Sequence, residues 1–179
     1  MIHKYPFILR FFHWTMALVL IGVIILGVMM ARFLTDEPYT GDMFLWHKSF
    51  GVVAMILIFF RMISRLALNK KVPSVSHTLP RYEQIGAVMG HGLLYVFMVV
   101  VPLSGYLMSS TYPKSSGIFL FTIPLPDALP KNLELSQIFT GIHIVSAYIL
   151  TALIVGHIAA VLKHRYFDKH ERNIMKRMW

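Results

Sequence analysis

The side chains best suited to chemistry in this chain are histidines. The sequence has 179 residues with nine His and no Cys. Five of the nine lie inside long apolar stretches, where an imidazole costs free energy and marks a functional site by default. They are His13, His47, His91, His143 and His157. Neutral imidazole is a common metal ligand, and without thiolates any bound metal depends on His, carboxylate, Met or backbone ligands.

The spacing of these histidines indicates two pairs at two depths. His143 and His157 are fourteen residues apart. On a helix they therefore share one face, about 40° out of register and about 21 Å apart along the axis. His47 begins its stretch at the level of His143, and His13 begins its stretch at the level of His157. Two stacked haems need this arrangement, but His91 also lies at the level of His157, so spacing leaves the choice between His13 and His91 open.

Other uses of the histidines are less well supported. A divalent metal site needs three or four ligands at one depth, often with carboxylates. No Asp or Glu lies within any apolar stretch, which disfavours a metal or proton transporter, although a His-lined transporter without haem stays an alternative. An iron between two imidazoles has no open position and serves as an electron carrier. Gly51, Gly141 and Gly156 adjoin the proposed ligands and leave room for a flat group, although small residues are common at membrane helix contacts.

The elements that must position the histidines are membrane-spanning helices. Hydrophobic residues make up 56% of the chain and charged residues only 14%, which excludes an ordinary soluble domain. Four stretches reach the roughly 20 residues of a span: 11–31, 43–66, 85–108 and 138–162. The first is too long for a cleavable signal peptide. We predict an all-α integral membrane protein, a four-helix up-down-up-down bundle forming a single domain over 1–179.

Two further segments are too short or too polar to span. Residues 117–125 are apolar but too short to cross, and prolines follow them, so a loop on the membrane surface or over the bundle is expected. Residues 163–179 are basic, and we expect them to continue the last span as an interfacial cytoplasmic helix.

The distribution of charge predicts the orientation. The net charge is +9. The side that holds both termini carries thirteen Lys and Arg against three Asp and Glu, whereas the opposite side carries four against five. Under the positive-inside rule both termini face the cytoplasm. Lipid head groups account for the basic face, so the charge does not call for nucleic acid.

Several motifs covering almost the whole chain resemble the bacterial cytochrome b561 family. They are RFFHW at 10–14, LWHKSFG at 45–51, RMISRL at 61–66, GHGLLY at 90–95, PLSGYLM at 102–108, GIHIVSAY at 141–148 and GHIAAVLKHRYFDKHERNIMKRM at 156–178. The resemblance implies a multi-pass cytochrome of the bacterial inner membrane with two haem b groups. It implies that His13 and His157 hold the cytoplasmic-side iron and that His47 and His143 hold the periplasmic-side iron. His91 is then left to contact a haem propionate or a quinone.

The resemblance also implies a direction of electron flow. One branch of the family oxidises superoxide at the periplasmic face and reduces ubiquinone, so superoxide:quinone oxidoreductase is the candidate activity. The alternative is a haem-bearing subunit without its own catalysis, which serves a partner dehydrogenase or a periplasmic protein. Lys48 and Arg32, with Lys114, are candidates for a basic mouth that attracts an anion. The acids Asp36, Glu37 and Asp42 oppose such a field, and each cation has a plainer explanation in interfacial snorkelling.

Three more side chains are candidates on the cytoplasmic side. His164 follows His157 by seven residues, near the same helix face and about 10 Å further along the axis. An imidazole there suits proton transfer to a quinone. Arg61 and Arg65 are candidate partners of haem propionates, because charge-assisted contacts favour Arg. A solvated or lipid-facing basic collar is the alternative for all three.

Overall fold

The structure is a computed structural model that describes residues 4–32, 40–73, 80–167 and 177–178. Four long helices account for most of them, and each is long and apolar enough to cross a membrane. The prediction of an all-α four-helix membrane bundle is therefore confirmed. The helices begin and end one to five residues outside the predicted spans: α1 is Phe7–Arg32, α2 is Thr40–Ala67, α3 is Arg81–Thr111 and α4 is Leu133–Tyr166. A short 3-10 helix, Asn69–Lys71, follows α2.

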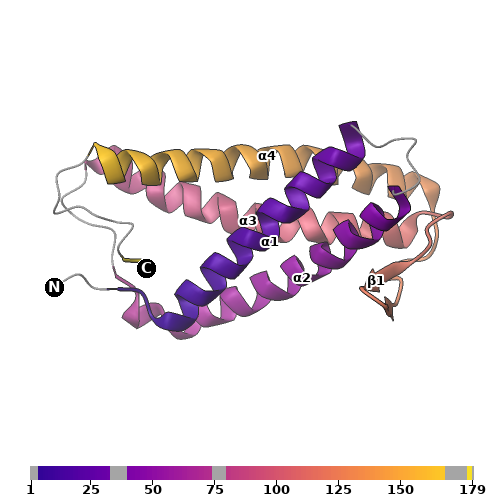
Figure 1. The fold of residues 1–179 in the computed structure, drawn as a ribbon, viewed down its shortest axis with the longest axis horizontal. Helices are drawn as coiled ribbons and strands as arrows, with labels where there is room; N and C mark the ends of the chain where they lie inside the picture. The colour runs from indigo at the N-terminus through magenta and orange to yellow at the C-terminus, as the bar shows by residue number, and fades with distance from the viewer. Residues whose placement is uncertain (1–3, 33–39, 74–79, 168–176, 179) are drawn as a thin grey trace.

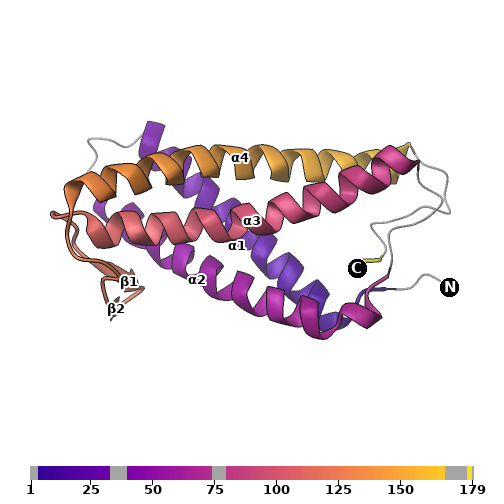
Figure 2. The same cartoon turned by 180° about the vertical axis from the view of Figure 1, so that it is seen from behind.

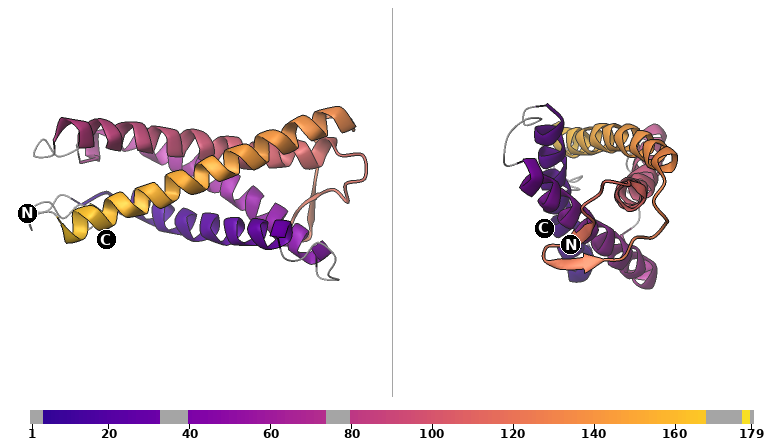
Figure 3. Two further views of the ribbon diagram at one scale, coloured as in Figure 1. Left: turned by 90° about the horizontal axis from the view of Figure 1, so that it is seen from above. Right: turned by 90° about the vertical axis from the view of Figure 1, so that its right-hand side faces the viewer.

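Successive helices run in opposite directions and form two pairs (Figures 1 and 2). The α1 and α2 helices pack together, and α3 packs closely against α4, while α2 also contacts α3. By contrast, α4 makes little backbone contact with α1 or α2. The end-on view in Figure 3 shows the two pairs facing each other. The histidines on α4 therefore have to meet α1 and α2 between helices whose backbones are not in close contact.

The two ends of the bundle are easily told apart. At one end the Tyr5 amide donates a hydrogen bond to the Arg177 carbonyl at 3.0 Å, and Trp14 Nε1 donates to the Met178 carbonyl at 2.9 Å. We call this the terminal end. The opposite end carries two short strands, both labelled in Figure 2, and is called the hairpin end.

The bundle has a small core and a large apolar exterior. Its core lies half-way along the helices and consists of Met16, Leu20, Ala54, Ile58, Met98 and Leu150. Many large apolar side chains point outward instead; Leu18 is 75% exposed and Val155 is 62% exposed. Contiguous apolar surface on this scale is costly in water, and lipid is the solvent that suits it.

The segment predicted as a loop is an antiparallel hairpin over α2. Strands β1 (Ile118–Leu120) and β2 (Ile123–Leu125) pair with Ile118 opposite Leu125. The fully buried Ser49 of α2 joins the hairpin through its hydroxyl, which donates to the Phe119 carbonyl and accepts from the Phe121 amide, both at 3.0 Å. The hairpin is thus attached to α2 at Ser49, two residues after His47 in the sequence.

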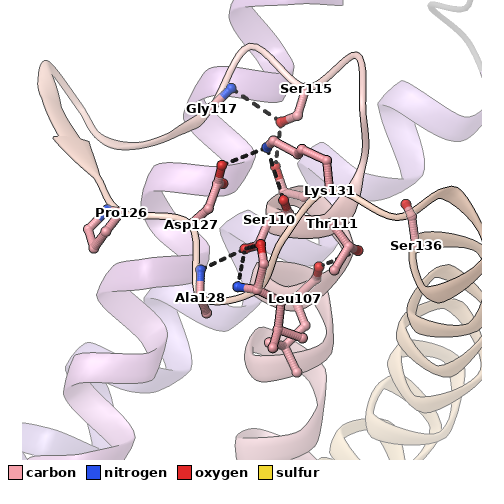
Figure 4. A network of polar contacts seen from close by, with 12 residues as sticks. Leu107, Ser110, Thr111, Ser115, Gly117, Pro126, Asp127, Ala128, Lys131 and Ser136 are labelled. Atoms are coloured by element: carbon pink, nitrogen blue, oxygen red, sulfur yellow. Dashed lines mark hydrogen bonds and ion pairs between the residues drawn. The ribbon is translucent and has the colours of Figure 1, made fainter.

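The connection between α3 and α4 is tied to the last turn of α3 (Figure 4). The buried Ser110 hydroxyl accepts the amides of Ala128 and Leu129 at 2.7 and 3.1 Å. Lys131 Nζ donates to the Ser110 carbonyl at 2.9 Å and pairs with Asp127 at 2.7 Å. A cation at a helix C-terminus also interacts favourably with the helix dipole. These contacts give the hairpin end a defined shape beside α4.

Parts of the earlier expectations fall outside the described residues. The tail prediction covers 163–179, of which 163–166 form the last turn of α4 while 168–176 and 179 are not described. Asp36 and Glu37 also lie outside the described residues.

Candidate functional site

The fold brings both predicted histidine pairs together. His47 on α2 and His143 on α4 have ring centroids 6.2 Å apart, with their planes 87° apart. His13 on α1 and His157 on α4 have centroids 6.3 Å apart, with their planes 67° apart. The first pair lies toward the hairpin end and the second toward the terminal end. Along α4 the two levels are about 21 Å apart, and the core residue Leu150 lies midway between them in sequence.

These separations match two imidazoles on opposite sides of one metal ion. A metal–imidazole bond is about 2 Å long, and a ring of roughly 1.33 Å bonds has its centroid about 1.1 Å behind the nitrogen. Two imidazoles in line across a metal therefore have centroids about 6.3 Å apart. Both pairs have this separation, although they join different helices.

His91 is closer to His157 but less well placed for a shared ligand. Its ring centroid is 5.5 Å from that of His157, and its Nδ1 donates to the Ala87 carbonyl of its own helix at 2.6 Å. His91 is on α3, which packs closely on α4, whereas α1 makes little backbone contact with α4. A flat group between two ligands must separate their helices. Helix packing therefore favours His13 over His91, a choice that spacing left open.

At the hairpin-end pair, contacts from neighbouring helices orient the rings. His143 Nδ1 lies 2.9 Å from the Val101 carbonyl, a contact that assigns the proton to Nδ1 and leaves Nε2 free as a ligand. His47 Nδ1 is buried without a well-formed hydrogen bond and interacts only weakly with the Val23 backbone. A buried ring nitrogen with so little to bind is unusual, and it fits a ring that a bound group helps to orient.

Two glycines make this orientation possible, and the sequence did not single them out. A Cβ at Gly105 of α3 would lie 2.9 Å from His143 Cε1, and a Cβ at Gly27 of α1 would lie 3.2 Å from His47 Cε1. Each imidazole thus rests against bare backbone. By contrast, a Cβ at Gly51, Gly141 or Gly156 would meet nothing within 4 Å. Gly105 belongs to the PLSGYLM motif, but its contact with His143 follows only from the helix packing.

Of the two arginines predicted near the terminal-end pair, Arg61 forms a hydrogen bond with a histidine of that pair, whereas Arg65 lies near His91. Arg61 donates a hydrogen bond from Nη2 to His13 Nδ1 at 3.1 Å. Its Nε lies 3.4 Å from the Tyr95 hydroxyl, and its guanidinium carbon lies 5.6 Å from the Tyr95 ring centroid. Arg65 instead donates to Asn69 Oδ1, four residues further along. Tyr95 was missed because its role depends on α3 lying beside α2.

The predicted basic mouth is only partly assembled. Lys48 Nζ donates to the Gly117 carbonyl at 3.1 Å, and Lys48 is close enough to Lys131 for the two charges to repel. Arg32 is the exposed last residue of α1, and Lys114 is exposed in the connection after α3. Lys131, which the sequence did not single out, is therefore the cation that the fold places with Lys48.

At the terminal end, His164 lies on the last turns of α4 beyond His157. One residue before it, Lys163 forms an ion pair with Glu83 at the start of α3. This pair joins α3 to α4 at the end where a proton relay is expected. Within the described residues no three His, Asp or Glu side chains converge, as the ligands of a divalent metal site would need to do.

Comparison with known proteins identifies the family of this chain. The family described as prokaryotic cytochrome b561 matches residues 4–179. The chain belongs to this family. It is similar to cytochrome b561 homolog 2 of Escherichia coli strain K12, with 27% identity over 178 residues, which cover 98% of this chain and 90% of that protein. It is also similar to cytochrome b561 homolog 1 of the same strain, with 29% identity over 123 residues, which cover 69% of this chain and 68% of that protein.

Membership of the cytochrome b561 family implies b-type haem and electron transfer in a bacterial membrane. The residues present fit such a group at both levels. Each pair has the centroid separation of two axial ligands, joins helices with little mutual contact, and offers imidazoles that are only half-buried. At the hairpin end, His143 holds its proton away from the facing ring. At the terminal end, Arg61 donates to His13 Nδ1, which places the ring proton on Nε2; that proton would have to move to Nδ1 for Nε2 to serve as an iron ligand.

The contact between Gly105 and His143 makes a prediction for haem binding. In Gly105→Ala the new methyl group must push the His143 ring out of position, because 2.9 Å is shorter than any ordinary carbon contact. We expect fewer haems per purified chain and a lower thermal stability of those that remain. The matched control is Gly22→Ala on α1, where a Cβ meets nothing within 4 Å. A pyridine haemochrome assay gives the number of haems per chain, and equal numbers in both variants would contradict the role of Gly105.

Proposed function

We propose that this protein is a di-haem b-type cytochrome of the bacterial inner membrane that carries electrons between a periplasmic donor and the quinone pool. The observation that carries the proposal is the pair of matched imidazole separations, 6.2 and 6.3 Å, at opposite ends of α4. In this proposal His47 and His143 hold the periplasmic-side haem, and His13 and His157 hold the cytoplasmic-side haem. The excess of Lys and Arg at the terminal end supports a cytoplasmic position for that end.

The chain and the haem have separate tasks in this proposal. Bound haem supplies one-electron oxidation and reduction. The chain fixes the imidazoles through Val101, Gly105 and Gly27 and sets the distance between the two levels. It also fills the middle of the bundle with apolar side chains such as Leu150, which exclude water between the two levels.

The proposed donor at the hairpin end is superoxide. Its support is the cation pair Lys48 and Lys131, because clustered positive charge raises the local concentration of an anion. Lys48 follows His47 directly in the chain and is held by the Gly117 carbonyl. The charge of Lys131 is partly neutralised by Asp127 at 2.7 Å, which leaves Lys48 as the main attractive charge.

The proposed acceptor at the terminal end is a quinone, with ubiquinone as the first candidate. Reduction of a quinone needs protons as well as electrons. His164 lies about two turns beyond His157 on α4, where an imidazole is able to pass a proton from the cytoplasm. His91 donates from Nδ1 to the Ala87 carbonyl. Its Nε2 therefore accepts from a quinol hydroxyl when the ring is neutral, and donates to a quinone carbonyl or a haem propionate when the ring is protonated.

One experiment tests the proposal in two half-reactions. Haem is first counted on the purified chain, where two b haems are expected. Stopped-flow spectroscopy then follows haem reduction by superoxide and haem reoxidation by a soluble ubiquinone analogue. We expect Lys48→Gln to slow the first step by about tenfold at low salt, and the matched surface variant Lys114→Gln to have little effect. His164→Asn is expected to slow only reoxidation.

Each outcome of this experiment decides something. A chain purified folded with no haem overturns the proposal and favours transport. If the chain binds two haems but superoxide reduces them no faster than in a spontaneous control, superoxide is not the donor. That result favours a haem-bearing subunit that takes electrons from a dehydrogenase or a periplasmic protein. Unchanged reoxidation in His164→Asn rejects the proton relay.

A further inference from the structure

Arg61 is a charged side chain inside a membrane span with an unusual set of partners. Its guanidinium reaches His13 of α1 at 3.1 Å and lies against Tyr95 of α3. A charge at membrane depth normally has a counter-ion or a function. Among the described residues the carboxylates lie near helix ends or in the connection before α4: Asp42, Glu83, Asp127 and Glu134. Glu83 and Asp127 are each paired with a lysine.

The two histidine pairs therefore differ in electrostatic surroundings. Around His47 and His143 the described residues make neutral contacts: the Val101 carbonyl, the Ser104 hydroxyl, and the backbone of Gly27 and Gly105. Lys48 adjoins His47 in sequence, but its ammonium group is bound to the Gly117 carbonyl of the hairpin connection. Around His13 and His157 one contact is a permanent cation, because guanidinium does not lose its proton in proteins.

From this asymmetry we propose that Arg61 sets the direction of electron transfer by raising the reduction potential of the haem at the terminal end. The inference rests on the proposed function, since it needs a haem at each pair. Ferric haem carries one more positive charge than ferrous haem, so a nearby cation destabilises the oxidised state. The terminal-end haem then holds the electron more tightly than the hairpin-end haem. The electron gained at the hairpin end moves toward the terminal end, where the quinone is proposed to react.

Tyr95 makes the effect of Arg61 a fixed property of the fold. Its ring lies under the guanidinium, and its hydroxyl lies 3.4 Å from Nε. Contact with an aromatic face is favourable for a guanidinium, more so where water is scarce. The cation therefore stays beside His13 when Nδ1 carries a proton and no longer accepts the Arg61 hydrogen bond. Arg61 is thus a positioning and tuning residue, and it is not an iron ligand.

The test is a potentiometric titration of the full-length, haem-loaded protein, followed by its visible spectrum. We expect Arg61→Gln to shift the oxidised-to-reduced equilibrium of one haem about tenfold toward the oxidised form, which is about 59 mV for one electron. The oxidised-to-reduced equilibrium of the other haem is expected to change by less than about threefold. Arg61→Lys keeps the charge and is expected to keep most of the potential. Lys70→Gln is the matched control, because it removes an exposed charge in the 3-10 helix that follows α2.

Two further variants separate this inference from the proposed function. His143→Ala, which is expected to retain only the terminal-end haem, shows which haem Arg61→Gln shifts when the two changes are combined. If Arg61→Gln does not retain haem, Tyr95→Leu releases the guanidinium and is expected to lower the same potential. Equal potentials in wild type, Arg61→Gln and Tyr95→Leu overturn the inference while leaving two haems in place. A shift confined to the hairpin-end haem overturns it as well. A haem count of none in the wild type overturns the proposed function itself.

Discussion

Replacing His143 with alanine is expected to remove one of two haems per chain and to leave the other with an unchanged spectrum. The physical reason is that His143 and His47 form one pair, with centroids 6.2 Å apart, whereas the pair at the other level is about 21 Å away along α4. Loss of one axial ligand leaves a haem held on one side only. Haem content by pyridine haemochrome and the reduced-minus-oxidised spectrum measure the result.

The double variant His47→Ala/His143→Ala makes this prediction sharper. If both imidazoles bind one iron, the double variant loses the same single haem as each single variant, because removing either ligand already abolishes the site. Effects of residues that act as a unit are not additive in this way. If the double variant instead loses two haems while each single variant loses one, the two histidines serve different groups, and the pairing is wrong.

The second large effect is expected at the terminal end, where His157→Ala and His13→Ala each remove the other haem. His91→Ala is the matched control at the same depth and is expected to keep both haems. The reason is the packing of the helices: α3 and α4 are in close contact, whereas α1 and α4 are not. A porphyrin between His91 and His157, whose ring centroids are 5.5 Å apart, would have to separate a closely packed helix pair.

This second prediction has a clear opposite outcome. The hydrogen bond from His91 Nδ1 to the Ala87 carbonyl leaves His91 Nε2 without a proton, as an iron ligand requires. The hydrogen bond from Arg61 to His13 Nδ1 instead leaves the proton of His13 on Nε2. Loss of a haem in His91→Ala with retention of both in His13→Ala would show that this hydrogen-bonding pattern outweighs helix packing. Two haems in all three variants would contradict ligation at this end altogether.

The sequence already predicted the elements and most of the candidate residues. Four apolar stretches of sufficient length imply four spanning helices, because only a helix satisfies the backbone of an isolated span in lipid. The regular rise of a helix then converts residue number into depth. His143 and His157 consequently had to lie at two levels on one face of α4, and His47 and His13 at matching levels. The position of His164 beyond His157 followed in the same way.

Contacts between helices depend on rotation and packing, which residue numbers do not specify. The sequence therefore left His13 and His91 as alternatives, and treated Arg61 and Arg65 alike, although the fold turns Arg61 to His13 and Arg65 to Asn69. It also passed over Gly105 and Tyr95, whose importance comes from the neighbour each one meets.

The hairpin end shows the same division between sequence and structure. Residues 117–125 were too short to span, which the sequence established from length alone. Their pairing as β1 and β2 over Ser49, and the approach of Lys131 to Lys48, were decided by the fold. The sequence by itself thus determined the number of spans, the depth of each histidine and the excess of positive charge at one end. The tertiary structure decided which side chains at a given depth face each other, because a helix fixes height along its axis but not the direction in which it packs.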